Sequence, residues 1–134
     1  MKMSNDLEKK FQEQITLEFA ASITYRQLAI EADEQDLSGI AAWLRHQADE
    51  EIVHANKFIQ HVSDRGNHAA IGAIAAPEVT PGLSVLEIFE AALAHEEKVS
   101  ESIRELYRSA DKEGDYDSRP LLRSEEHTSE LQSY

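Results

Sequence analysis

Three long segments of the sequence carry apolar residues at steps of three, four or seven positions, the spacing that places side chains on one face of an α-helix. They run from about residue 5 to 33, from 37 to 64 and from 84 to 113. Segments of about 28 residues would each be about 42 Å long at 1.5 Å per residue. Helices of this kind bury their apolar faces against one another, so the sequence predicts an all-α bundle.

The connections between these segments predict how the helices are arranged. The first link is short and favours an antiparallel hairpin, whereas residues 66–83 contain two prolines and show no helical period. A connection of that length can cross the bundle, which would make the second and third helices parallel. Ser84 and Glu87 form a capping-box pattern at the start of the third helix, and a fourth helix is expected to begin near Pro120.

Each apolar stripe also contains an acidic residue near its middle. The stripes are Leu7, Phe11, Glu18, Ala21, Tyr25 and Leu28; Ile40, Leu44, Gln47, Glu51, His54, Phe58 and His61; and Leu86, Phe89, Leu93, Glu96, Ser100, Ile103 and Tyr107. An ionised carboxylate that is buried without a partner costs several kcal/mol. Either buried basic residues or a cation would remove this cost, and the stripes carry no Lys or Arg near that level. A metal ion is therefore the better neutraliser.

The spacing of the polar residues fits a metal site. Glu51 and His54 lie at positions i and i+3, one helical turn apart on the same side. Carboxylate oxygen with imidazole nitrogen and without sulfur suits iron or manganese. Glu51 could bridge two ions, with His54 and Glu18 completing one position and Glu96 the other. A Glu-x-x-His pair alone is common on exposed helices, so the prediction depends on the pattern across three stripes.

Composition limits the classes of partner. The chain has 134 residues, the size of one domain, with 13 basic and 26 acidic residues and a net charge of -13. Such a chain repels nucleic acid and anionic membranes and attracts cations, although solubility alone explains the acidity equally well. Cysteine is absent, which excludes disulfides and thiolate metal sites. The sequence has neither a signal-peptide core nor an apolar run of membrane-spanning length, so we expect a cytoplasmic protein.

Three stretches resemble the corresponding helices of prokaryotic non-haem ferritins. These stretches read "EQITLEFAASITY", "ADEEIVHANKFI" and "ALAHEEKVSESIREL", and the resemblance covers about residues 5–122. It implies a ferritin-like antiparallel four-helix bundle with a long crossover between helices two and three. Haem-binding bacterioferritins use a methionine of the second helix, and the only methionines here are Met1 and Met3. The resemblance therefore implies iron, as Fe(II) and Fe(III) in a di-iron centre, and no haem.

The resemblance also implies roles for individual residues. The ligands of the ferroxidase di-iron centre would be Glu18, Glu51, His54 and Glu96. Tyr25 would donate a hydrogen bond to the glutamate of the third helix, and Glu50 would contribute to an accessory iron site facing the interior.

The fourth helix departs from the family pattern. An ungapped count places its two further ligand positions at Ser129 and Gln132, neither of which is a carboxylate. The residues beyond Leu122 read as the translation of a common sequencing-library adapter. We therefore expect a ferritin-like domain at residues 1–122, a shortened fourth helix and a non-native tail at 123–134, with a divergent natural tail as the alternative. The second iron position would then be weaker than in the family.

The resemblance implies an iron-storage protein with ferroxidase activity, which oxidises Fe(II) with O2 or H2O2. The family forms 24-subunit cages, in which the fourth and fifth helices help to close the threefold and fourfold contacts. Since half of the fourth helix and the fifth helix are missing here, we expect a homodimer, or another partial assembly, more readily than a full cage. A peroxidase of the rubrerythrin type and a non-catalytic metal-binding or structural bundle remain alternative hypotheses. No nucleic-acid or membrane partner is expected.

Overall fold

The computed structural model describes residues 1–132, and these fold into four α-helices and one short 3-10 helix. The elements are α1 (Asn5–Glu34), α2 (Ser38–Asp64), α3 (Val85–Lys112), η1 (Tyr116–Ser118) and α4 (Arg119–Gln132). The first three helices agree with the predicted segments to within one residue at each end. No strand occurs in residues 1–132, which confirms the predicted all-α class.

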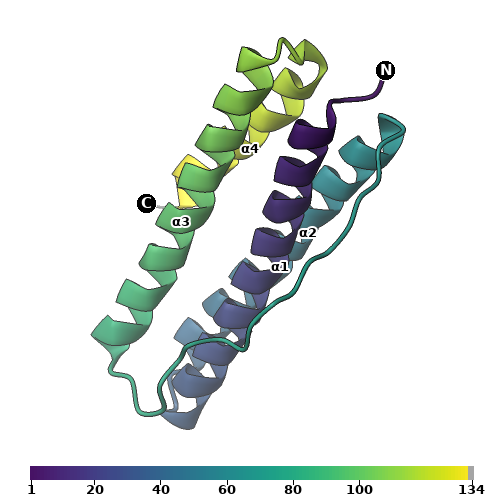
Figure 1. The fold of residues 1–134 in the computed structure, drawn as a ribbon. Helices are drawn as coiled ribbons and strands as arrows, with labels where there is room; N and C mark the ends of the chain where they lie inside the picture. Colours follow the sequence, from purple (N-terminus) through teal and green to yellow (C-terminus); the bar gives the residue numbers. More distant parts are fainter. Residues whose placement is uncertain (133–134) are drawn as a thin grey trace.

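The helices form a bundle with the predicted order (Figure 1). Helices α1 and α2 make an antiparallel hairpin, and the long connection then runs back along α1, so that α3 is antiparallel to α1 and parallel to α2. Helix α4 returns along α3 but has only 14 residues and ends beside the middle of α3. The antiparallel four-helix bundle with a long crossover and a shortened fourth helix is thus confirmed.

Local sequence signals set the helix ends. The side chain of Ser4 accepts a hydrogen bond of 3.1 Å from the backbone N–H of Leu7 and so caps α1. At the start of α3 the predicted capping box is present: Glu87 N donates to Ser84 Oγ at 3.2 Å, and Ser84 N donates to Glu87 Oε1 at 3.0 Å. Gly66 follows α2 with a φ of 74°, a conformation that residues with a Cβ rarely adopt.

The apolar stripes predicted on α1 and α2 lie in the core. Phe11 and Phe58 are fully buried and pack with their ring centroids 6.1 Å apart. Leu7, Leu28 and Leu44 are also fully buried. This packing fixes the faces of the two helices that carry the acidic residues.

The stripe predicted on α3 is wrong in its first half. Leu86, Phe89 and Leu93 are 66%, 42% and 45% exposed, and the buried residues of this region are Ile88 and Ala92. The physical reason is that this face of α3 meets α4 only further along, where Ser100 contacts Ser129 and Tyr107 accepts a hydrogen bond from Arg123. Helix α4 ends beside the middle of α3 and does not cover its beginning (Figure 1).

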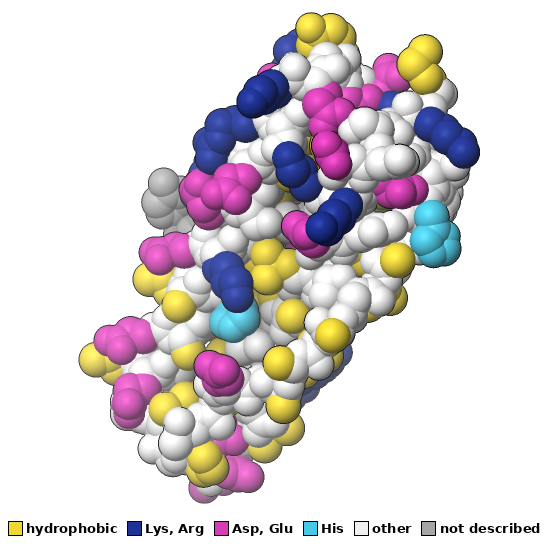
Figure 2. Space-filling view, in the orientation of Figure 1, with side chains coloured by type: hydrophobic (Ala, Val, Ile, Leu, Met, Phe, Trp, Pro, Cys, Tyr) yellow, Lys and Arg dark blue, Asp and Glu magenta, His cyan; other side chains and the backbone are white. Residues whose placement is uncertain are grey.

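The exposed apolar residues of α3, Leu86, Phe89 and Leu93, share the surface with many acidic groups. On the face shown in Figure 2, Lys and Arg gather in the upper half, while apolar and acidic side chains dominate the lower end, where α3 begins. Within residues 1–132, no helix has the length and apolar character needed to cross a membrane.

Candidate metal centre

Glu18, Glu51 and His54 form a buried group at the centre of the bundle. Helix α1 supplies Glu18 and α2 supplies the other two, and each offers a ligand atom within 4.8 Å of the others. His54 Nδ1 lies 3.6 Å from Glu51 Oε2 and 3.8 Å from Glu18 Oε2. Both glutamates are 0% exposed and His54 is 3% exposed. The helical spacing of Glu51 and His54 places them one turn apart, and the hairpin brings Glu18 to the same level.

Glu96 of α3 adjoins this group but is held from another side. Its Oε1 accepts a hydrogen bond of 2.5 Å from Tyr25 Oη, the contact that the resemblance implied for these two residues. Glu96 is 5% exposed, and its charge interacts with that of Glu51. Glu51 and His54 are therefore both close enough to Glu96 for their charges to interact with it.

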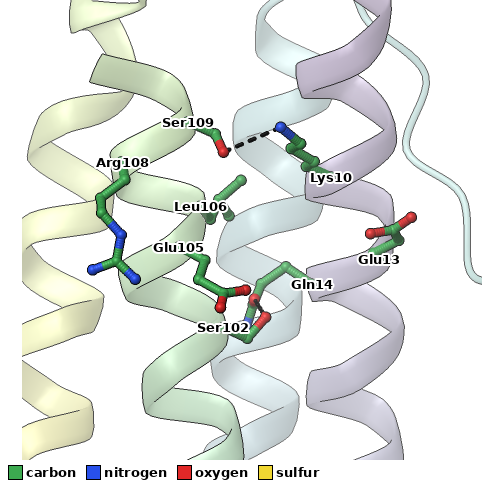
Figure 3. A pocket seen from close by; sticks show the side chains of 8 residues that line it. All are labelled: Lys10, Glu13, Gln14, Ser102, Glu105, Leu106, Arg108 and Ser109. Atoms are coloured by element: carbon green, nitrogen blue, oxygen red, sulfur yellow. Dashed lines mark hydrogen bonds between the residues drawn. The ribbon is translucent and has the colours of Figure 1, made fainter. Parts of the chain in front are cut away.

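A chain of two hydrogen bonds orients Glu18. Gln14 Nε2 donates to Glu18 Oε1 at 3.0 Å, and Ser102 Oγ of α3 donates to Gln14 Oε1 at 2.5 Å. Figure 3 shows Gln14 and Ser102 facing each other at the base of the groove between α1 and α3. Gln14 was not predicted from the sequence, although its place one turn before Glu18 on the buried face is a signal that could have revealed it.

The acidic oxygens of the site have the character of metal ligands. Four oxygens are buried and have no hydrogen-bond partner within the described part of the chain: Glu18 Oε2, both oxygens of Glu51, and Glu96 Oε2. Buried carboxylate oxygens without partners are costly unless a cation binds them. A donor set of oxygen and one imidazole nitrogen suits iron, manganese or zinc. The residues present therefore fit a divalent cation.

Burial and the neighbouring charges shift the pKa values of the groups in the site. Burial and the neighbouring Glu18 raise the pKa of Glu51 to about 8, and burial raises the pKa of Glu96 to about 7. Burial by itself lowers the pKa of His54, but Glu18 and Glu51 outweigh it and raise this pKa to about 10. Burial and the charge of Glu96 raise the pKa of Tyr25 far above its usual range, so its phenol remains a hydrogen-bond donor. Without a cation, the site retains protons at neutral pH.

The structure places a further glutamate beside His54, which the sequence analysis did not predict. Glu125 of α4 is 1% exposed, and its Oε2 lies 3.8 Å from His54 Nδ1. It lies within the adapter-like text of residues 123–134, so the sequence showed no sign of this contact before the packing of α4 was known.

The remaining predicted positions lie outside the central group. Glu50 is partly exposed and faces His46, whose Nε2 lies 3.7 Å from Glu50 Oε1. Ser129 is buried and contacts Ser100 of α3. The side chain of Gln132 lies outside the part of the chain whose side chains the structure describes, as do residues 133–134 of the expected tail.

A family model, several sequence relatives and a solved structure are similar to this chain. The family model described as Ferritin-like domain matches residues 8–132. A bacterial non-heme ferritin of Staphylococcus saprophyticus is 36% identical over 114 residues, which cover 85% of this chain and 68% of that protein. The corresponding protein of Staphylococcus haemolyticus is 34% identical with the same coverage. An open pore ferritin from the hyperthermophilic archaeon Archaeoglobus fulgidus has a TM-score of 0.93 at 28% identity, covering 98% of this chain and 81% of its own.

Proposed function

The chain belongs to the ferritin-like family, and we propose that it stores iron and oxidises Fe(II) at the buried site around Glu51. The observation that carries this proposal is the group of Glu18, Glu51 and His54, whose ligand atoms converge in the buried interior of the bundle. Fe(II) is the substrate of this reaction, bound by Glu18, His54 and Glu51 on one side and by Glu51 and Glu96 on the other. The names of the relatives, which are non-heme ferritins, support the same substrate.

The reaction transfers one electron from each of two Fe(II) ions to the oxidant. O2 takes up two electrons and two protons to form H2O2, or H2O2 takes up two electrons and two protons to form two waters. Buried carboxylates favour the oxidation of Fe(II) to Fe(III), because their negative charge stabilises a trivalent ion more strongly than a divalent one at low dielectric. Tyr25 and Gln14 hold Glu96 and Glu18 by hydrogen bonds, so each carboxylate has one oxygen left for the ion.

Aerobic oxidation of Fe(II), followed by the absorbance of the ferric product, tests the activity. We expect the unmodified chain to oxidise Fe(II) faster than buffer does, and Glu51→Ala to reduce the rate to the buffer level. Glu90→Ala is the matched control, since Glu90 is an exposed glutamate of α3 and should leave the rate unchanged. Equal rates for the chain, for Glu51→Ala and for buffer would rule out ferroxidase activity.

A bundle that binds metal without turnover is the second candidate. The three residues with mutually close ligand atoms suffice for one ion, and Glu96 is held to Tyr25 outside that group. Such a protein would bind Zn²⁺ or Mn²⁺ through Glu51 and His54 but would show no Fe(II) oxidation above buffer. Titration of metal alongside the oxidation assay distinguishes the two functions.

We also propose that the chain is cytoplasmic and that Glu50 contributes to an accessory iron position. A third proposal is that the chain forms a homodimer. Ile23 and Ile30 lie two turns apart on α1 and are 41% and 48% exposed, which leaves an apolar strip for a second copy. A mass measurement in solution should give twice the mass of one chain. A monomer at all concentrations tested would contradict the dimer.

A further inference from the structure

Gln14 is a buried amide that connects the central group to the groove between α1 and α3. Its side chain is 1% exposed, and its Nε2 donates a hydrogen bond of 3.0 Å to Glu18 Oε1. On the other side, Gln14 Oε1 accepts a hydrogen bond of 2.5 Å from the hydroxyl of Ser102. Gln14 and Ser102 both line the groove (Figure 3). A partly exposed serine of α3 is therefore linked to the carboxylate of Glu18 through one side chain.

The hydroxyl of Ser102 sets which end of the Gln14 amide faces Glu18. A glutamine amide has a carbonyl oxygen that accepts hydrogen bonds and an NH₂ group that donates them. Because Ser102 donates to the oxygen, the NH₂ group is directed to the carboxylate. The reversed amide would place two acceptor oxygens against each other and leave the buried Oε1 of Glu18 without a donor. Ser102 thus keeps Gln14 in the orientation in which it donates.

The fixed amide leaves Glu18 with one oxygen for an ion. Oε1 is held by Gln14, whereas Oε2 is buried and has no hydrogen-bond partner within the described residues. Oε2 is also the oxygen that lies 3.8 Å from Nδ1 of His54. To turn both oxygens to one ion, the carboxylate would have to rotate and lose its bond to Gln14. Glu18 therefore offers a single ligand atom.

The number of ligand atoms affects which cation a site prefers. Zn²⁺ is usually bound by four ligands, among which imidazole nitrogen is common. Ca²⁺ takes six to eight oxygen ligands and often binds both oxygens of one carboxylate. Limiting Glu18 to one oxygen beside the nitrogen of His54 suits Zn²⁺ and Fe²⁺ better than it suits Ca²⁺.

We infer that Gln14 and Ser102 are specificity-determining residues of the metal site, which restrict Glu18 to one oxygen and so favour Fe²⁺ and Zn²⁺ over Ca²⁺. Neither residue binds the ion, because Gln14 acts through Glu18 and Ser102 acts through Gln14. The inference rests on the proposed function, since it concerns the ion that Glu18, Glu51 and His54 would hold.

Competition between two ions tests the inference without any redox reaction. The quantity measured is the Ca²⁺ concentration that displaces half of the bound Zn²⁺. Gln14→Met keeps an unbranched side chain of similar length but removes the donor, and we expect this concentration to fall about 10-fold or more. A general loosening of the site would weaken both ions alike and leave the concentration unchanged. A change of less than about 2-fold in Gln14→Met would overturn the inference.

Ser102→Ala gives a second readout, which decides the question if Gln14→Met does not fold. We expect the same concentration to fall about 3-fold or more, and a change of less than about 2-fold would overturn the inference. Adding Ser102→Ala to Gln14→Met should change the result by less than about 2-fold, because Ser102 acts through Gln14. An effect of Ser102→Ala that is as large without Gln14 as with it would contradict the proposed link.

Matched controls come from the same helices. Gln12→Met makes the same change on α1, where Gln12 Nε2 donates to the backbone oxygen of His68 instead of to the site. Ser109→Ala makes the same change on α3, where Ser109 Oγ accepts from Lys10 Nζ in the same groove. Both controls should leave the Ca²⁺ concentration within about 2-fold of that for the unmodified chain.

Failure of this inference is distinct from failure of the proposed function. If the unmodified chain binds Zn²⁺ and Glu51→Gln abolishes the binding, the central site stands, and an unchanged competition in Gln14→Met then overturns only the role of Gln14. If the unmodified chain binds no Zn²⁺, both proposals fail.

Discussion

The phenol oxygen of Tyr25 donates a hydrogen bond of 2.5 Å to Oε1 of Glu96, a residue 71 positions later in the chain. Both side chains are buried, Tyr25 at 0% and Glu96 at 5% exposed. The bond joins α1 to α3 beside Glu51 and leaves the second oxygen of Glu96 without a hydrogen bond in the described structure. It therefore sets which oxygen of Glu96 is available to an ion.

Tyr25→Phe should destabilise the protein, because it leaves the buried Oε1 of Glu96 without this donor. We expect the free energy of unfolding to fall by about 1–3 kcal/mol, measured by urea denaturation in the absence of metal. Tyr116→Phe is the control, since Tyr116 is 61% exposed. A loss in Tyr25→Phe no larger than that in Tyr116→Phe would show that the bond contributes nothing to stability.

Metal binding should release protons. The pKa of Glu51 is raised to about 8 and that of His54 to about 10, so at neutral pH the free site holds protons that an ion must displace. Mn²⁺ affinity should therefore increase as the pH rises from about 6 to about 8. Calorimetry at one pH in two buffers of different ionisation enthalpy measures the number of protons released. Identical heats in both buffers would show that no protons are released.

His61 should make the fold sensitive to acid. Burial and the charge of Arg65 lower its pKa, although Asp64, Asp115 and Asp117 act in the opposite direction. The unfolded chain then binds a proton more readily than the folded chain below about pH 6.5. The stability that the neutral imidazole contributes is therefore present above that pH and is lost as the pH falls.

The measurement for His61 is the loss of stability between about pH 7 and about pH 5 in urea denaturation. We expect a smaller loss in His61→Gln than in the unmodified chain. His46→Gln should retain the full loss, because the side chain of His46 is 67% exposed. Equal losses in all three proteins would assign the acid sensitivity to other groups.

Neighbouring apolar residues at the start of α3 should differ sharply in importance. Ile88 is fully buried, so Ile88→Ala should cost about 2–5 kcal/mol of unfolding free energy. Leu86 is 66% exposed, and Leu86→Ala should stay within about 0.5 kcal/mol. Thermal or urea unfolding of the two variants checks this. A larger loss of unfolding free energy in Leu86→Ala than in Ile88→Ala would mean that Leu86 is buried, as the sequence predicted, and would contradict the packing of α3.

Much of the fold and of the site followed from local patterns. The bounds of α1, α2 and α3, the capping box at Ser84 and the juxtaposition of Glu51 with His54 all depend on residues within a few positions of one another. The helical period expresses such relationships directly, because residues three or four apart share a face whatever the rest of the chain does. The ligand roles of the site residues, the di-iron state and the domain limit at residue 122 stay predictions.

Packing between distant segments decided the rest. Which apolar residues of α3 turn inward depends on the rotation of α3 against α1 and on where α4 ends, so Ile88 replaced Leu86 in the core. Ser102, 88 positions after Gln14, donates a hydrogen bond to the side chain that in turn donates to Glu18. Glu125 of α4 lies beside His54 of α2, with 3.8 Å between Oε2 and Nδ1. The sequence by itself determined the helices and the acidic residues on their faces, since both are set by short-range geometry. Only the tertiary structure decided which polar groups meet, because that depends on how whole helices rotate and slide to bury their apolar surface.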